Sequence, residues 1–336
     1  MLTSRLDYEL PEGLIAQIPA EPRDASRLMV VDVKRGTIAH HTFRDLPDFL
    51  RPGDALVLNE TKVMPARLKA RKPTGGEVEL LFLRDLGSDL NNAWEVLARP
   101  SKRLRPGLVL VVGEDRLELV ENLGDGHWTV TTRDVLRLLR RSGTMPLPPY
   151  IRPTPETERR YQTVYARNEG SAAAPTAGFH FTQGVLDKAE KAGAQLARVT
   201  LHVGVGTFMP VRTERLEEHS MHAEQYNVPP HAARVVQGSR RLVAAGTTVA
   251  RTLETWAATG EAEGESKLFV YPGYRWLAVD TLLTNFHLPR STLLAMVMSF
   301  GGEDLVREAY ATAVRERYRF YSFGDAMLLL DGGRRQ

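Results

Sequence analysis

Ala174-Pro175-Thr176-Ala177-Gly178-Phe179-His180-Phe181-Thr182 joins a polar, loop-forming segment to a predicted helix. Gly178 allows the backbone to turn where a side chain would clash. His180 stands between two phenylalanines at the entrance to that helix, which Thr182 is suited to cap. Free N–H groups at a helix N-terminus attract polar or anionic ligands. The stretch therefore predicts a ligand site, with a half-buried, hydrogen-bonded histidine as the structural alternative.

The composition is that of a globular protein with one large domain or two ordinary ones. The chain has 336 residues, of which 43% are hydrophobic and 25% are charged. It contains no Cys, which excludes disulfides and thiolate chemistry. Because no apolar run of about 18 residues occurs and the first residues are too polar for a signal peptide, we expect a cytoplasmic protein without a membrane span.

Positive charge is concentrated in the middle of the chain. Residues 61–152 contain 16 Lys and Arg against 11 Asp and Glu, whereas the whole chain has a net charge of +3. A basic middle on a near-neutral remainder suggests a face that meets a polyanion. A solvated, charge-rich surface would give the same count.

Both ends of the chain have the pattern of an α/β domain. Apolar runs bounded by turn residues predict strands at 27–32, 55–58, 194–203, 241–245 and 279–284, and helices at 182–191, 249–258 and 293–300. The strand at 55–58 leads into Asn59-Glu60-Thr61-Lys62, a polar cluster of the kind that α/β proteins use for ligand contacts.

The middle of the chain predicts a different architecture. Five short strands with glycine-containing turns are expected at 77–83, 93–98, 108–112, 116–120 and 127–131, which indicates a small antiparallel barrel or sandwich. Its loops are expected to hold Lys69, Arg71, Lys72, Lys102, Arg103 and Arg105. A predicted helix at 134–141 carries Arg137, Arg140 and Arg141. The expected domains are therefore 1–65 plus 151–336, and an inserted 66–150.

Three later segments also place a histidine among polar residues and glycine or proline. His202 is followed by Gly204 and Gly206, which lack the third glycine of a dinucleotide fingerprint. His222 is two residues from Glu224, so in an extended segment both would face the same way, as a base with its orienting carboxylate or as a structural ion pair. His287 lies between Asn285 and Arg290. On the helix at 249–258, Arg251 is spaced to pair on the surface with Glu254.

These residue types exclude several common kinds of site. No two of the four histidines have the i, i+4 spacing of a helical zinc site, so we expect no metal. No G-x-S-x-G occurs, which argues against a serine hydrolase of that type. A polar pocket with several acid/base candidates, aromatic walls and glycines suits a nucleoside-like ligand on which protons are moved.

The chain closely resembles the S-adenosylmethionine:tRNA ribosyltransferase-isomerase family of queuosine biosynthesis in the segments 174–182, 200–208, 221–224 and 284–292. The likeness runs in order and nearly from end to end, and it also includes the segments 12–32, 58–67, 246–248, 251–254 and 321–327. The family usually has Ser and Trp at the positions of Ala223 and Gln225. The resemblance implies an α/β main domain interrupted by a small antiparallel β-barrel domain, in agreement with the change of pattern after residue 65.

The resemblance also implies an activity. S-adenosylmethionine is consumed as a substrate, with no separate cofactor, and its ribosyl part moves to 7-aminomethyl-7-deazaguanine at the wobble position of a tRNA with a GUN anticodon. The ribosyl group rearranges to an epoxycyclopentane, giving epoxyqueuosine-tRNA, and adenine and methionine leave. The expected protein is a cytoplasmic monomer that binds tRNA through the basic residues of the inserted domain. Its contacts with tRNA are assigned to Lys69, Arg71, Lys72, Lys102, Arg103, Arg105, Arg137, Arg140 and Arg141.

This chemistry needs a base for the proton beside the sulfonium and an acid for the departing adenine. His180 or His202 is expected to serve, and Glu224 to orient His222 or to face the sulfonium. Phe179 or Phe181 is expected to pack on the adenine or the target base. The remaining substrate contacts are assigned to Thr176, Gly178, Gly204, Gly206, Thr207, Thr247, Arg251, Asn285, His287 and Arg290.

Two other functions remain open from the sequence. An ordinary methyltransferase would also use S-adenosylmethionine, but the glycine-rich first strand-helix turn is absent, and its product would be S-adenosylhomocysteine. A tRNA-binding module without catalysis would not need His, Gly and Thr concentrated at strand ends.

Overall fold

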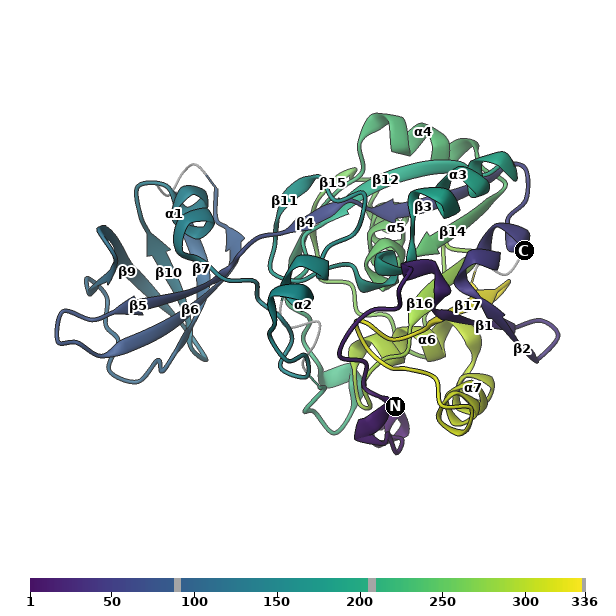
Figure 1. The fold of residues 1–336 in the computed structure, drawn as a ribbon, viewed down its shortest axis with the longest axis horizontal. Helices are drawn as coiled ribbons and strands as arrows, with labels where there is room; N and C mark the ends of the chain where they lie inside the picture. Colours follow the sequence, from purple (N-terminus) through teal and green to yellow (C-terminus); the bar gives the residue numbers. More distant parts are fainter. Residues whose placement is uncertain (88–91, 205–209, 334–336) are drawn as a thin grey trace. The chain divides into compact units, whose positions relative to one another are not determined.

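The computed structural model describes residues 1–87, 92–204 and 210–333, which form two compact units (Figure 1). One unit contains Met1–Thr61, Pro149–Arg167 and Pro175–Gln336, and the other contains Lys62–Pro148 and Asn168–Ala174. The first is an α/β domain and the second is built on a closed antiparallel barrel, so the predicted fold class is confirmed. Residues 168–174 differ from the expected division, because β11 (Asn168–Ser171) pairs with β4 (Thr61–Val63) and joins the barrel unit.

The first unit is organised around a nine-stranded mixed sheet in the order β15-β13-β12-β3-β14-β16-β17-β1-β2. Its four neighbouring strands β12, β3, β14 and β16 run parallel. Strands β3, β14 and β16 are buried along their whole length, as continuous apolar runs in parallel sheets are. The strands are β1 (Arg27–Asp32), β2 (Thr37–Thr42), β3 (Asp54–Asn59), β12 (Gln195–Leu201), β13 (Glu224–Asn227), β14 (Arg241–Ala245), β15 (Glu263–Ser266), β16 (Thr281–Asn285) and β17 (Ala326–Leu330).

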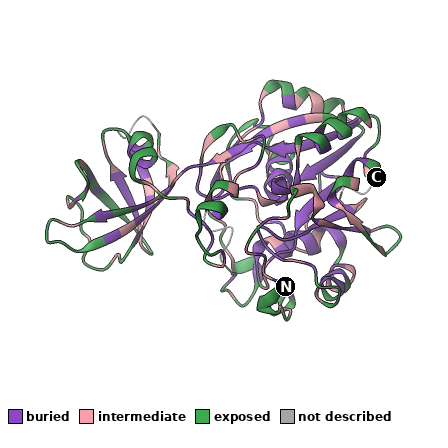
Figure 2. Ribbon diagram, viewed as in Figure 1, coloured by how far each residue is buried: buried purple, intermediate pink, exposed green. Residues whose placement is uncertain are grey.

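Helices and short 3₁₀ turns cover this sheet. The α-helices of the unit are α2 (Pro155–Arg160), α3 (Gln183–Lys191), α4 (Pro230–Gly238), α5 (Thr247–Thr259), α6 (Thr292–Gly301) and α7 (Glu303–Arg315). Alternate residues of β1, β3, β14 and β17 form one apolar core with α3 and with the 3₁₀ helix η4 (Phe43–Phe49). Helix α5 packs against β3, β12, β14 and β16. Figure 2 shows the buried residues concentrated in these strands.

The second unit contains a barrel of six strands closed in the order β10-β7-β6-β5-β8-β9. Five of them occupy the predicted positions, and the sixth, β5, was expected to be a loop. Its sequence RLKAR has charges at three positions, but Leu68 and Ala70 alternate with them and point into the barrel core. The strands are β5 (Arg67–Arg71), β6 (Glu77–Asp85), β7 (Ala93–Arg99), β8 (Val109–Val112), β9 (Asp115–Gly124) and β10 (His127–Thr131).

The predicted helix of the second unit is present as α1 (Val135–Ser142), and the side chain of Asp134 caps it. Within the described residues, no helix is long and apolar enough to cross a membrane.

Candidate active site

The parallel strands β12, β3, β14 and β16 bring their carboxyl ends to one edge of the sheet, where open α/β sheets bind ligands. His202 follows β12, Asn59 ends β3 and Asn285 ends β16. Gly246 follows β14 and has a φ of 110°, and Thr247 begins α5 directly after it. The segments singled out in the sequence therefore meet at this edge because the strands that carry them are neighbours.

Asn59 joins three of these strand ends. Its buried side-chain amide donates to the Leu201 carbonyl at 3.0 Å and to the Thr248 hydroxyl at 3.2 Å. Its side-chain oxygen accepts from the backbone N–H groups of Leu201 and Thr61, each at 3.1 Å. Asn59 thus fixes β3 against β12 and the start of α5. In the sequence it appeared as one member of a polar cluster with no assigned role.

His202 has the geometry of an acid/base group. Its Nδ1 lies 2.8 Å from the Thr61 hydroxyl, and its backbone N–H donates to the carbonyl of Gln225. Burial lowers the pKa of His202, so the neutral imidazole is favoured. Among the described residues, no hydrogen bond to Nε2 is found.

His180 has a different environment. Its ring is buried, stacks 5.0 Å from Phe43, and has its Nδ1 2.8 Å from the Ser26 hydroxyl. Its Nε2 lies 3.2 Å from the side-chain amide nitrogen of Asn285. Burial lowers the pKa of His180 to about 4. Both ring nitrogens are occupied by protein groups, which matches the structural alternative and leaves His202 as the better acid/base candidate.

The two phenylalanines beside His180 are also internal. Phe181 packs edge-on against Phe43 and Tyr165 in the main core, and Phe179 packs against Tyr161 and Phe323. Their exposed fractions are 0% and 2%, respectively. Because both rings are buried in the protein, neither has an exposed face on which a substrate base could stack in the way expected from the sequence.

Asn285 connects the 3₁₀ helix η6 (Thr176–His180) to β16. Besides contacting His180, its amide nitrogen donates to the Tyr321 carbonyl at 3.0 Å, and its oxygen accepts from the Thr176 hydroxyl at 3.4 Å. His287 is buried with Nε2 2.6 Å from the Thr284 hydroxyl. Arg290, in contrast, is exposed. Of the three predicted contacts in this segment, Arg290 is therefore the one whose side chain is open to solvent.

Glu224 and Arg251 form a buried ion pair that the sequence did not predict. Both side chains are 4% exposed, and Glu224 also accepts from the backbone N–H of Gly204 at 2.7 Å. The pair links α5 and β13 to the segment that follows His202. His222, which the sequence predicts as the partner of Glu224, has an exposed side chain.

The expected surface pair between Arg251 and Glu254 is wrong. Glu254 is completely buried and accepts hydrogen bonds from the backbone N–H groups of residues 277–279, at 2.7 to 3.0 Å. The Tyr274 hydroxyl donates to it as well, at 3.1 Å. Helical spacing places Arg251 and Glu254 on one face, but each has its partner in a segment distant in sequence. Arg251 pairs with Glu224, and Glu254 binds the backbone of residues 277–279. Gly206 and Thr207 lie outside the described residues.

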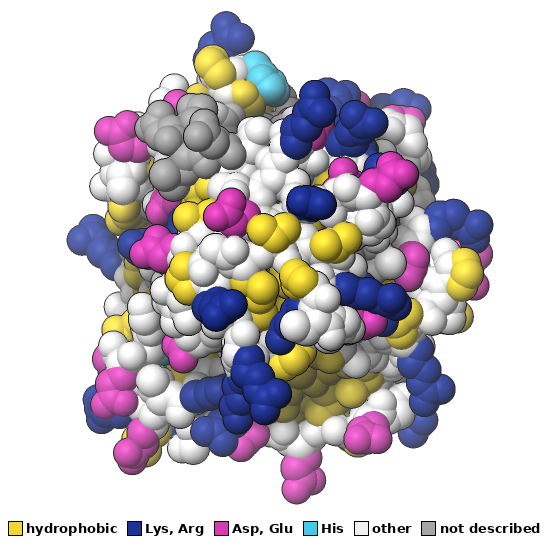
Figure 3. Space-filling view, turned by 90° about the vertical axis from the view of Figure 1, so that its left-hand side faces the viewer, with side chains coloured by type: hydrophobic (Ala, Val, Ile, Leu, Met, Phe, Trp, Pro, Cys, Tyr) yellow, Lys and Arg dark blue, Asp and Glu magenta, His cyan; other side chains and the backbone are white. Residues whose placement is uncertain are grey.

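The basic residues assigned to tRNA fall into two groups. Lys69, Arg140 and Arg141 form ion pairs with Glu77, Glu169 and Asp115. Within the described part of the chain, no ion pair is found for the others, namely Arg71, Lys72, Lys102, Arg103, Arg105 and Arg137. Lys69 and Arg71 lie on β5 rather than in the expected loop. Figure 3 shows several groups of Lys and Arg on the face it draws, with hydrophobic side chains between them.

The family model described as "Queuosine biosynthesis protein" matches residues 3–329. A relative from Rubrobacter xylanophilus named S-adenosylmethionine:tRNA ribosyltransferase-isomerase is 70% identical over 335 residues, covering 99% of both chains. One of the same name from Symbiobacterium thermophilum is 52% identical, covering 98% of this chain and 100% of its own. The chain belongs to the S-adenosylmethionine:tRNA ribosyltransferase-isomerase family.

A solved structure agrees with this assignment. The crystal structure of the S-adenosylmethionine tRNA ribosyltransferase from Thermotoga maritima matches with a TM-score of 0.57 and 41% identity, covering 97% of this chain and 100% of that one. As a member of this ribosyltransferase-isomerase family, the chain is an enzyme of tRNA modification. The described residues contain no group of three or more His, Cys, Asp or Glu side chains placed to hold a metal ion.

Gly178 is required by packing in the first unit. A Cβ at this position would lie 2.3 Å from the Tyr165 hydroxyl oxygen and 2.7 Å from a Thr163 methyl. We expect Gly178→Ala to lower the free energy of unfolding by about 1–3 kcal/mol, the usual cost of overpacking. Urea denaturation measures the change, with Gly238→Ala as control, since no atom lies within 4 Å of its added Cβ. An equal effect of the two substitutions would contradict this packing.

Acid should destabilise the protein through its buried histidines. Burial lowers the pKa of His180 to about 4 and that of His287 to about 3, whereas unfolded histidine titrates near ~6.5. Below that pH the unfolded chain binds protons that the folded chain does not. The free energy of unfolding should therefore fall as the pH drops from ~6.5 to ~4, by up to ~1.4 kcal/mol per pH unit for each histidine.

Urea denaturation at several pH values measures this dependence. His180→Gln should be less stable than the parent protein at pH ~7 but should lose less stability on acidification, because one titrating group is gone. His231→Gln, at an exposed position on α4, should leave the dependence unchanged. An unaltered slope in His180→Gln would show that His180 is not held neutral by the fold.

Proposed function

We propose that this chain transfers the ribosyl part of S-adenosylmethionine to 7-aminomethyl-7-deazaguanine at the wobble position of tRNA. The acceptor is a tRNA with a GUN anticodon, the transferred group is isomerised to the epoxycyclopentane of epoxyqueuosine, and adenine and methionine are released. S-adenosylmethionine is a substrate, and no further cofactor is required. The enzyme acts as a monomer in the cytoplasm. Family membership supports the reaction, and the site geometry supports the assignment of roles.

The observation that carries the assignment of the acid/base is the environment of His202. It stands at the carboxyl edge of the sheet with Nδ1 held by Thr61 and with a lowered pKa. A neutral imidazole held in this way can remove the proton beside the sulfonium and return a proton to the departing adenine. Thr176 and Thr247 remain candidates for contacts with the substrate, and Arg290 for a contact with the sugar or the methionine carboxylate.

Two labelled forms of the substrate test the reaction. With the label in the ribose of S-adenosylmethionine, radioactivity should move to tRNA that carries the aminomethyl-deazaguanine base. With the label in the methyl group, it should not move to tRNA. Transfer of the methyl label together with S-adenosylhomocysteine would instead establish a methyltransferase.

The basic loop of the barrel unit should contribute to tRNA affinity. Lys102, Arg103 and Arg105 are exposed, and no ion pair is found for them within the described residues. Replacing all three by Gln should weaken tRNA binding and reduce the slope of log affinity against log salt by up to ~3, about one for each lost phosphate contact. Binding titrations at several salt concentrations measure both quantities.

A matched triple variant serves as the control for the three cations. It replaces Glu114, Glu118 and Glu121 by Gln, which alters the charge of the same unit in the opposite direction and removes no cation. If the Lys102, Arg103 and Arg105 variant retains the parent slope, these residues do not contact tRNA phosphates.

A further inference from the structure

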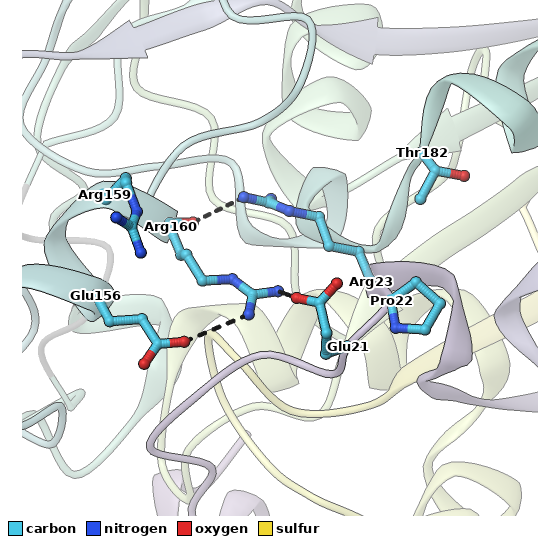
Figure 4. Close-up of a pocket in the computed structure, with 7 residues that line it drawn as sticks. All are labelled: Glu21, Pro22, Arg23, Glu156, Arg159, Arg160 and Thr182. Carbon is cyan, nitrogen blue, oxygen red and sulfur yellow. Dashed lines mark hydrogen bonds and ion pairs between the residues drawn. The ribbon is translucent and has the colours of Figure 1, made fainter.

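A polar pocket in the α/β unit is lined by three arginines. It has a volume of about 490 Å³ and is lined by Arg23, Arg159, Arg160, Glu21 and Glu156, with Thr182 at one end (Figure 4). Arg159 and Arg160 end α2, and Glu21 and Arg23 come from the N-terminal segment. None of the roles proposed above uses these residues.

Two of the arginines are fixed by backbone carbonyls. Arg23 donates to the carbonyls of Gln162 at 2.8 Å and Arg160 at 3.2 Å, and Arg160 donates to that of Ala20 at 3.0 Å. A neutral carbonyl holds a guanidinium in place without cancelling its charge. The two groups are therefore already oriented before any ligand arrives, which lowers the entropic cost of binding one.

The positive charge of the pocket is only weakly compensated. Arg160 pairs with Glu21 and Glu156, whose side chains are 76% and 53% exposed, and such exposed pairs contribute little. Arg159 is exposed, and among the described residues no hydrogen bond or ion pair is found for it. Burial and then the charge of Arg160 lower the pKa of Arg23, and the charge of Glu21 acts in the opposite direction. A bound anion would compensate the positive charge that remains.

The pocket is connected to the candidate active site through one short segment. Arg23 also donates to the carbonyl of Phe179 at 3.4 Å and packs 5.8 Å from its ring centre. The same turn, η6, carries Thr176, whose hydroxyl reaches Asn285 at the carboxyl edge of the sheet. A nucleotide whose base enters the site is flanked by its own phosphates, so cations carried by this segment are candidates to contact one of them.

We propose that this arginine pocket binds a backbone phosphate of the tRNA close to the modified nucleotide. Guanidinium groups suit phosphate because their planar N–H groups match its oxygens. Arg159, for which no ion pair is found among the described residues, supplies one cation, and Arg160, held in place by the Ala20 carbonyl, exchanges its exposed carboxylate partners for the phosphate. The pocket then fixes the position of the RNA chain without reading its sequence. This inference rests on tRNA being the substrate.

The test compares Arg159→Gln with Arg234→Gln, an exposed arginine on α4 for which no hydrogen bond or ion pair is found within the described residues. The probe is tRNA carrying the aminomethyl-deazaguanine base, titrated at several salt concentrations. Arg159→Gln should weaken binding by about 3- to 10-fold and lower the salt slope by about one, whereas Arg234→Gln should change neither. Arg159→Lys should keep the slope, since it keeps the charge.

Turnover separates this inference from the proposed function. At saturating tRNA and S-adenosylmethionine, Arg159→Gln should retain the parent rate, and the KM for S-adenosylmethionine should be unchanged. If the parent protein converts its substrates and Arg159→Gln binds tRNA with the affinity and slope of Arg234→Gln, the phosphate site is wrong and the proposed function stands. If the parent protein neither binds nor modifies this tRNA, the proposed function itself fails.

Discussion

His202→Gln should lower the rate of ribosyl transfer by about 10²- to 10⁴-fold, the usual contribution of a general acid or base. Binding of tRNA and S-adenosylmethionine should change little, because glutamine can still hydrogen-bond to the Thr61 hydroxyl that holds Nδ1. Single-turnover rates and separate binding titrations measure the two effects. Equal losses in rate and in binding would mean that His202 contacts the substrates without moving a proton.

The pH dependence gives a second readout for His202. Burial lowers its pKa below the ordinary histidine value, so the neutral base should persist as the pH falls through ~6.5 and the rate should decline only below that. In His202→Gln this decline should disappear. His180→Gln serves as the matched control, because both nitrogens of His180 are bonded to the protein and its loss should lower stability.

Glu224→Gln should cost about 3–5 kcal/mol in the free energy of unfolding, because it leaves Arg251 buried without its counter-charge. Activity should fall less than stability does, because the side-chain oxygen of glutamine can still accept from the backbone N–H of Gly204, two residues after His202. Urea denaturation and turnover measure the two effects. Glu316→Gln is the control in the same unit. Glu316 pairs with Arg315, their side chains are 49% and 67% exposed, respectively, and such an exposed pair should contribute less than ~1 kcal/mol.

A double substitution distinguishes the charge from the anchoring of Gly204. Replacing Glu224 by Leu and Arg251 by Met removes both buried charges, and apolar replacements of this kind often recover stability. The double variant should be more stable than Glu224→Gln but less active, because leucine, unlike glutamine, has no oxygen to accept from the Gly204 N–H. If Glu224→Gln is as stable as Glu316→Gln, the buried pair does not hold this part of the site.

The sequence predicted features that depend on local pattern. The strand at 27–32, the helix capped by Thr182 and the grouping of polar residues after β3, β12, β14 and β16 all follow from apolar runs and turn residues. The barrel was recognisable from short strands between glycines. Strand β5 was missed because three of its five residues are charged, and only their alternation with Leu68 and Ala70 shows the strand.

The partners of buried charges could not be predicted in this way. Helical spacing suggested that Arg251 pairs with Glu254, but Arg251 pairs with Glu224, and Glu254 binds backbone N–H groups more than twenty residues away. Such contacts depend on how the strands are ordered in the sheet, which no local periodicity contains. The same holds for His180 and His202, which look alike in sequence and differ in whether the fold occupies both ring nitrogens.

The most direct test of the proposed reaction is an analysis of its products. The protein is incubated with S-adenosylmethionine and tRNA carrying 7-aminomethyl-7-deazaguanine, and the small molecules and the digested nucleosides are examined by mass spectrometry. We expect free adenine, free methionine and a nucleoside bearing the epoxycyclopentane, all greatly reduced with His202→Gln. S-adenosylhomocysteine with a methylated nucleoside, or an unmodified nucleoside in the presence of bound tRNA, would contradict the proposed reaction.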